Sequence, residues 1–146
     1  NKDSRSNPKI ITEKFAWFPI WEYEDRKFTK EEIKILKQTD ILWLKAMPYM
    51  QYCSIIQKDG NLKKGNIIPI SEISTPELYI NEYVTVFSCE KWLNFSVTFT
   101  DFSDLTDKIN KIVTDGGYTP KEPLLMAIPV FKRKNYNFVQ IYVALE

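Results

Sequence analysis

The sequence predicts an α+β fold in which two helices pack on one face of an antiparallel sheet. Strand-like segments occur in neighbouring pairs joined by short polar turns, as in antiparallel hairpins. Two segments, 29–46 and 101–117, carry apolar residues at helical spacing. The order of elements is β-α-β-β, then a strand pair, then α-β-β. This order predicts two similar halves of the β-α-β-β type, over about 10–75 and 82–146.

The length of 146 residues suits one domain, which we place at 10–146, after a polar leader over residues 1–9. Such a leader often follows a cleaved export signal or a lipid-attachment cysteine, and it can equally begin a trimmed cytoplasmic protein. The two locations to be considered are therefore the cytoplasm and, after N-terminal processing, an exported periplasmic or lipoprotein form. No apolar run approaches the roughly 20 residues of a membrane span, so no transmembrane segment is expected.

The first elements are a strand and a helix. Residues 10–23 are aromatic and partly alternating, which predicts one strand with Pro19 at an edge or bulge. Thr29 is followed three residues later by Glu32, the spacing of a capping box at a helix start. A helix over about 29–46 is therefore expected next.

The middle of the chain is rich in strand signals. Segments 49–56 and 66–73 read as strands, and the loop 57–65 between them holds the Asp-Gly and Gly-Asn signals of a hairpin. Segments 82–89 and 93–100 form a further expected pair. In the second of these, apolar and polar residues alternate, which predicts a half-buried strand. The polar positions are Asn94, Ser96, Thr98 and Thr100.

The clearest helix lies over 101–117, where an Asp or Ser is expected to cap the first turn. Gly116 and Gly117 supply a left-handed C-terminal cap. Two final strands follow, joined by a basic loop at Lys132–Lys134 that is typical of a solvated turn. The apolar stripe of the helix consists of Leu105, Ile109, Ile112 and Val113.

The last strand has two contrasting faces. One is purely aliphatic and is expected to meet the helices. The other places Gln140 between the rings of Phe138 and Tyr142. This amide either faces solvent or a neighbouring strand, or it is the polar anchor of an otherwise apolar pocket. The aliphatic face consists of Val139, Ile141, Val143 and Leu145.

Composition excludes several functions. The chain has no histidine, which rules out Ser-His-Asp and Cys-His catalysis and any His-ligated zinc. Its 20 basic and 19 acidic residues leave a net charge of +1, which gives no field to attract nucleic acid. No cofactor is expected. An enzyme is the weaker interpretation, with Tyr142, Glu90 or Glu13 acting on water as its candidates. Cys53 and Cys89 are either two buried thiols or, in an exported protein, a disulfide.

The segment 107–146 resembles the C-terminal half of the GyrI-like family, which includes gyrase-inhibitor-like proteins and effector-binding domains of bacterial multidrug-response transcription activators. The resemblance lies in an amphipathic helix, the pair Gly117-Tyr118, a Pro-flanked strand, and a last strand of the type x-E-I-Y-I-P, here Val139–Ala144. It implies a pseudo-twofold pair of β-α-β-β units with a cleft between them that binds hydrophobic, often cationic, molecules. The cleft carboxylate of the family is Gln140 here. Since an amide carries no charge to neutralise a cation, a neutral ligand fits better.

The expected function is therefore non-catalytic binding of a small hydrophobic molecule, neutral or weakly polar, in an aromatic cleft between the two halves. The alternative is an exported lipoprotein or an immunity-type interaction protein that binds another protein, with aromatic side chains and the basic hairpin as contacts. The residues expected to bind the ligand are Gln140, Tyr142, Phe138, Trp17, Trp21, Tyr23, Tyr52 and Trp92.

Overall fold

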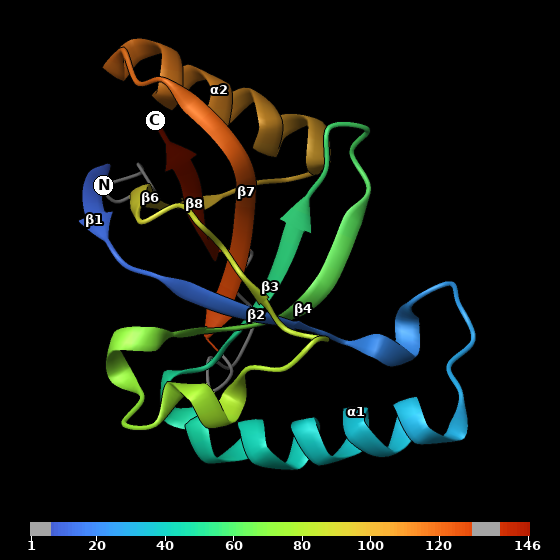
Figure 1. Ribbon diagram of the computed structural model, residues 1–146. Helices are drawn as coiled ribbons and strands as arrows, with labels where there is room; N and C mark the ends of the chain where they lie inside the picture. Colours follow the sequence, from blue (N-terminus) through green and yellow to red (C-terminus); the bar gives the residue numbers. More distant parts are fainter. Residues whose placement is uncertain (1–6, 130–137) are drawn as a thin grey trace.

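The computed structural model describes residues 7–129 and 138–146 and has the predicted α+β class. The helices are α1 (Lys30–Trp43) and α2 (Phe102–Gly116), with short 3-10 helices η1 (Trp21–Tyr23), η2 (Leu44–Tyr49), η3 (Ile70–Glu72) and η4 (Pro76–Tyr79). The strands are β1 (Lys9–Thr12), β2 (Phe15–Pro19), β3 (Gln51–Ile56), β4 (Leu62–Pro69), β5 (Thr85–Val86), β6 (Lys91–Thr98), β7 (Pro120–Pro129) and β8 (Phe138–Leu145). They form one antiparallel sheet in the order β1-β6-β8-β7-β3-β4-β2-β5, with α1 and α2 at opposite ends of the molecule (Figure 1).

The sheet curls until its two ends meet along one segment of chain. Strands β1 and β2 are separated only by Glu13 and Lys14, yet β1 pairs with β6 and β2 pairs with β4. The segment that contains β1 and β2 therefore pairs with strands near both ends of the sheet. The prediction of a single strand over 10–23 is wrong, because pairing with two partners divides the strand and η1 follows Pro19.

The pairing register assigns the side chains to two faces. Tyr52 lies opposite both Asn66 of β4 and Ile128 of β7, so these three side chains point to the same face. The two faces can therefore be followed from one half of the sheet to the other. We call the side that carries both helices the outer face and the side enclosed by the curl the inner face. Residues of α1 pack on Ala16, Phe18 and Ile68, and those of α2 pack on the aliphatic face of β8, all on the outer face. Both helices thus lie on one face, as predicted, and the aliphatic face of the last strand meets a helix.

The same pattern of pairing occurs twice. In the unit β2-α1-β3-β4, strand β4 lies between β2 and β3, and in β6-α2-β7-β8, strand β8 lies between β6 and β7. Strands β3 and β7 join the two units over Gln51–Ile56. The two β-α-β-β halves are therefore confirmed. The expected strand over 82–89 is reduced to the two residues of β5, and it pairs with β2 rather than with β6.

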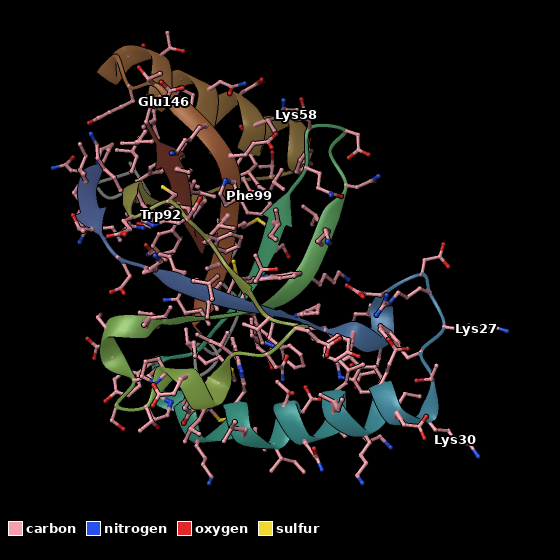
Figure 2. The ribbon with its side chains drawn as sticks, viewed as in Figure 1. Lys27, Lys30, Lys58, Trp92, Phe99 and Glu146 are labelled. Carbon is pink, nitrogen blue, oxygen red and sulfur yellow. The ribbon has the colours of Figure 1, made fainter. Side chains whose placement is uncertain are left out.

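The inner face is filled by a buried aromatic cluster. Its rings are Phe15, Trp17, Phe87, Trp92 and Tyr142, packed with the small side chains of Cys53, Cys89, Ala127 and Ala144. The Phe15 ring lies 5.4 Å from that of Trp92 and 5.2 Å from that of Tyr142, both edge to face. Trp92 is labelled beside β1 and β6 in Figure 2.

The curl also changes the environment of the polar side of β6. Asn94 and Ser96 are only 7% and 3% exposed, so the prediction of a half-buried strand is wrong at these positions. Alternation in sequence identifies the two faces of a strand, but it does not reveal that both are covered.

The ends of the helices follow their sequence signals. The capping box of Thr29 and Glu32 is formed, although α1 ends at Trp43 and passes into η2 rather than continuing to residue 46. Asp101 caps α2 by accepting a hydrogen bond from the Asp104 amide at 2.8 Å, and Gly117 adopts the left-handed conformation with φ of 68°.

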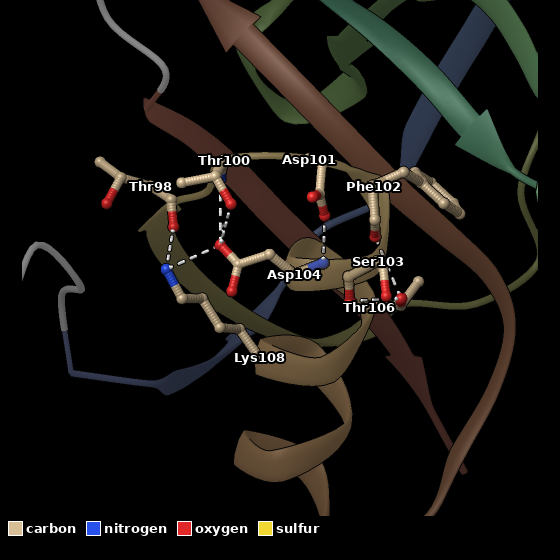
Figure 3. A network of polar contacts seen from close by, with 8 residues as sticks. All are labelled: Thr98, Thr100, Asp101, Phe102, Ser103, Asp104, Thr106 and Lys108. Carbon is tan, nitrogen blue, oxygen red and sulfur yellow. Dashed lines mark hydrogen bonds and ion pairs between the residues drawn. The ribbon is translucent and has the colours of Figure 1, made fainter.

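A network of polar contacts fastens the start of α2 to the end of β6 (Figure 3). The Asp104 carboxylate accepts from the Thr100 amide at 3.0 Å and forms an ion pair with Lys108 at 3.2 Å. The Lys108 ammonium also donates to the Thr98 carbonyl at 2.7 Å. These contacts hold α2 against the outer face at the point where its apolar stripe begins.

Within the described residues no helix is long and apolar enough to cross a membrane. Residues 1–6 of the expected leader, and the basic loop Lys132–Lys134, lie outside the described residues.

Replacement of Asp101 by Ala is expected to lower the free energy of unfolding by about 1 kcal/mol, because it removes the acceptor that caps α2. Urea denaturation followed by circular dichroism measures the change. Ser103→Ala, an exposed position in the same turn, is the matched control and should change the stability by much less. Equal losses in the two variants would show that the cap contributes nothing of its own.

Candidate ligand-binding site

The structure brings together only part of the predicted site. Trp17, Trp92 and Tyr142 meet in the inner aromatic cluster. Trp21 lies on the other side of the sheet, in the cluster beneath α1. Tyr23 is 72% exposed, at the end of η1, away from these rings.

Tyr52 and Phe138, two further residues of the predicted site, are not part of the inner aromatic cluster as the structure describes it. Tyr52 belongs to the outer face and is 50% exposed. Phe138 begins β8, and only its backbone is described. The eight predicted residues therefore do not line one cleft, and the inner cluster is a packed core where it was expected to be an open aromatic wall.

The two tryptophans of the inner cluster have structural partners. The Trp17 indole donates to the Cys53 carbonyl at 3.1 Å, and its ring covers Gly65, where an added Cβ atom would come within 2.4 Å of the ring. The Trp92 indole is fully buried and donates to the Glu13 carbonyl at 2.9 Å. Both rings therefore hold strands of the curled sheet together.

Gln140 lies on the inner face, as the alternation of β8 predicts. Its side-chain carbonyl accepts a hydrogen bond from the Asn94 amide at 3.1 Å, and the same Asn94 amide donates to the Ile141 carbonyl. The Gln140 side chain thus bonds to the neighbouring strand β6, as in the first of the two interpretations given by the sequence. Its carbonyl oxygen is already occupied and is a poor anchor for a ligand.

A cavity of about 270 Å³ opens at the end of the inner face, beside the aromatic cluster. This is room for roughly nine water molecules. Its apolar walls are supplied mainly by Ile11, Phe15, Ile67 and the Tyr142 ring, and Gln51, Glu13 and Tyr49 add polar groups. Strands of both halves contribute, since Tyr142 comes from β8 and Gln51 from β3.

The polar groups at this cavity are of two kinds. The side-chain oxygen of Gln51 is buried and has no hydrogen-bond partner among the described residues. Leaving such an acceptor unsatisfied costs about 1–3 kcal/mol, so a donor that enters the cavity gains this interaction. Burial raises the pKa of the Tyr142 phenol, with a hydrogen bond from the Gln51 side chain opposing the rise, so the phenol is neutral at pH 7.

The carboxylate of Glu13 is already satisfied by donors of the protein. It accepts hydrogen bonds from the Ser71 hydroxyl at 2.7 Å, the Ser71 amide at 3.3 Å and the Lys14 amide at 3.0 Å. Three donors stabilise the negative charge where it is. The cavity therefore offers an unpaired acceptor and a neutral phenol to a ligand, while the charge of Glu13 is already bonded to protein donors. The other carboxylate that lines the cavity, Glu72, is exposed to solvent.

Gln51 and Glu13 were missed as site residues by the sequence prediction. The alternation of β3 does place Gln51 on the same face as Cys53, opposite to Tyr52, so its inner position could have been inferred. Glu13 carried no comparable signal, because it falls at the division between β1 and β2, where the sequence predicts a continuous strand.

Both cysteines are buried within the inner cluster, and they are free thiols in this structure. Cys89 lies against the Lys91 carbonyl, with its sulfur 3.0 Å away, and Cys53 against that of Ser54. The disulfide considered from the sequence is thus not formed here. Among residues 7–129 and 138–146, no group of three or more Cys, Asp or Glu side chains could hold a metal ion.

No protein-family model matches the chain, and no curated protein matches its sequence. The resemblance to the GyrI-like family therefore stays a hypothesis, and any function has to be argued from the residues of the site.

Replacement of Gly65 by Ala is expected to destabilise the protein by about 1–3 kcal/mol, because the added methyl group overlaps the Trp17 ring. The free energy of unfolding in urea measures it. In a Trp17→Leu background the same change should cost much less, since the ring is gone. An undiminished cost in that background would assign the effect to the strand backbone rather than to Trp17.

The two thiols are expected to resist a thiol-specific disulfide reagent in the folded protein. Burial raises the pKa of the Cys53 thiol far above its usual range, which removes the reactive thiolate. We expect two equivalents to react after denaturation and almost none before. If no thiol titrates in denaturant without a reductant, the protein contains the disulfide instead.

Proposed function

We propose that this chain is a non-catalytic binding protein for a small hydrophobic molecule, neutral or weakly polar, held at the open end of the curled sheet. The observation that carries the proposal is the buried, unpartnered oxygen of Gln51 at a cavity whose walls are mostly apolar. A few polar groups in an apolar concavity are the usual composition of a small-molecule site.

The chemistry of the cavity favours a neutral ligand that donates a hydrogen bond. Glu13 is satisfied by Ser71 and Lys14, so it has little to offer a cation. The Tyr142 phenol can donate or accept, and Gln51 supplies an acceptor. An alcohol or amide on a ring or short chain matches both partners.

Catalysis is less well supported by the same groups. Because its pKa is raised, the Tyr142 phenol stays protonated at neutral pH and cannot act as a general base. Glu90, another candidate, is exposed and pairs with Lys14 at 3.7 Å. Neither group lies in an arrangement that would activate water.

The alternative, a protein that binds another protein, is favoured by exposed apolar residues near Tyr52. Ile41 is 65% exposed and Leu44 55% exposed, and both line the same depression of the surface as Tyr52. Ile128 lies opposite Tyr52 in the sheet and is also partly exposed. Isolated apolar residues on a surface are common, and contiguous ones more often contact a partner.

Benzyl alcohol is expected to bind the protein more tightly than toluene, because only the alcohol donates to Gln51. Amide NMR titrations of both compounds should show saturable shifts at Gln51 and Tyr142. In Gln51→Leu the advantage of the alcohol, about 1 kcal/mol or several-fold in Kd, should disappear.

Gln38→Leu, an exposed glutamine on α1, is the matched control and should keep the advantage. The proposal fails if neither compound shifts these residues saturably, and the protein-partner alternative then becomes the better one. It also fails if Gln51→Leu discriminates between the two compounds as well as the wild-type protein.

A further inference from the structure

A second cavity, of about 380 Å³, lies on the outer face at the C-terminal end of α1. It is separate from the inner site, because the sheet stands between them. Its floor is formed by Phe18 of β2 and by Asn66 and Tyr52 of the neighbouring strands, and its sides by α1, η2 and the start of η1. In Figure 1 this region lies along the lower helix, opposite to α2.

The walls of this outer cavity are aromatic and flexible. The rings of Phe18 and Trp43 lie 5.6 Å apart, and Tyr52 is half exposed at the edge. Met47 and Met50 also line the cavity. Unbranched thioether side chains adapt to ligands of different shape, and ring faces attract cations.

Three acceptor groups line the cavity, together with the Tyr52 phenol and the Asn66 amide nitrogen, which can donate. The acceptors are the carboxylates of Asp40 and Glu22 and the side-chain oxygen of Asn66. The Asn66 oxygen is buried and has no hydrogen-bond partner among the described residues. Asp40 accepts one hydrogen bond, from the Trp21 indole to Oδ2 at 2.9 Å.

The negative charge at this cavity has no counterion within the described ranges. No ion pair there includes Asp40 or Glu22. Burial raises the pKa of the Asp40 carboxyl, the bond from Trp21 opposes the rise, and the charge of Glu22 adds to it. The two carboxylates therefore repel each other, which is relieved when a cation enters.

Two basic side chains of the same region are engaged elsewhere. Arg26 lies over the Phe28 ring at 4.1 Å and pairs with Glu32, and Lys64 lies over the Tyr23 ring at 5.2 Å. The contrast with the inner site is clear, since there the carboxylate of Glu13 already has three donors. At the outer cavity, Asp40 accepts a hydrogen bond from the Trp21 indole, and no ion pair of the described residues includes either carboxylate.

We propose that the outer cavity binds a primary ammonium or guanidinium group carried on an apolar stem. The N–H groups donate to Asp40, Glu22 and Asn66, and the stem lies against Trp43, the methionines and Tyr52. A quaternary ammonium group fits less well, because it has no N–H to donate and leaves Asn66 unsatisfied. The group can be a free alkylamine or the lysine or arginine side chain of another protein.

Titration with hexylammonium, followed by amide NMR, tests the proposal. Saturable shifts are expected at Asp40, Trp43 and Tyr52. 1-Hexanol, which has the same stem without the charge, and tetraethylammonium, which has the charge without a donor, should bind about tenfold more weakly or worse. Equal affinity for the three compounds would overturn the proposal.

Substitution of the carboxylates gives the second part of the test. Asp40→Asn keeps an acceptor for Trp21 but removes the charge, and it should weaken hexylammonium about tenfold. Glu22→Gln, at an exposed position, should weaken it less but measurably, and it serves if Asp40→Asn does not fold. Asp107→Asn, an exposed aspartate on α2, is the matched control and should leave the affinity unchanged. Unchanged affinity in both cavity variants would also overturn the proposal.

The source of the cation is distinguished by a peptide. Acetyl-Leu-Lys-Leu-amide carries the ammonium group on a lysine stem, flanked by apolar residues that can contact exposed Ile41 and Leu44. Tighter binding of the peptide than of hexylammonium identifies a basic side chain of a protein partner as the natural occupant, and tighter binding of hexylammonium identifies a free amine. Binding of neither contradicts the proposal.

Discussion

One segment of chain, Lys9–Pro19, hydrogen-bonds at both ends of the sheet, and the rest of the structure depends on this. Its first part pairs with β6 and its second part with β4, so a sheet that could have remained open and twisted becomes an enclosure. The inner face then has to be filled. The Phe15 ring of β2 lies 5.4 Å from Trp92 of β6 and 5.2 Å from Tyr142 of β8, although β2 is far from these two neighbouring strands in the strand order. Both helices pack on the outer face.

This division into two faces separates two kinds of chemistry. On the inner face, the carboxylate of Glu13 is bonded to neighbouring donors and the phenol of Tyr142 is kept neutral by burial. The outer face beside α1 keeps Asp40 and Glu22 close together without a described counterion. A neutral donor suits the first environment and a charged donor suits the second. The two proposals therefore concern different ligands and can succeed or fail separately.

Local signals in the sequence predicted local structure well. The capping box at Thr29, the cap of α2 at Asp101 and Gly117, and the aliphatic face of β8 were all readable, because each involves neighbours along the chain or a simple periodicity. The closure of the sheet was not, since nothing between residues 10 and 23 indicates that one strand serves two distant partners. For the same reason Asn94 and Gln140, two polar residues that bond to each other across β6 and β8, were not recognised as a pair.

The pairing of β3 with β7 joins the two halves of the sheet, and it determines what each half would expose if the chain were divided. Residues Gln51–Ile56 lie opposite Leu124–Pro129 along the full length of β3, so each half provides the neighbouring strand that the other needs. Cut between β5 and β6, the chain would leave two fragments, each with an unpaired strand edge that invites association with another copy. Joining the two halves in one polypeptide makes the pairing of β3 with β7 intramolecular and independent of concentration.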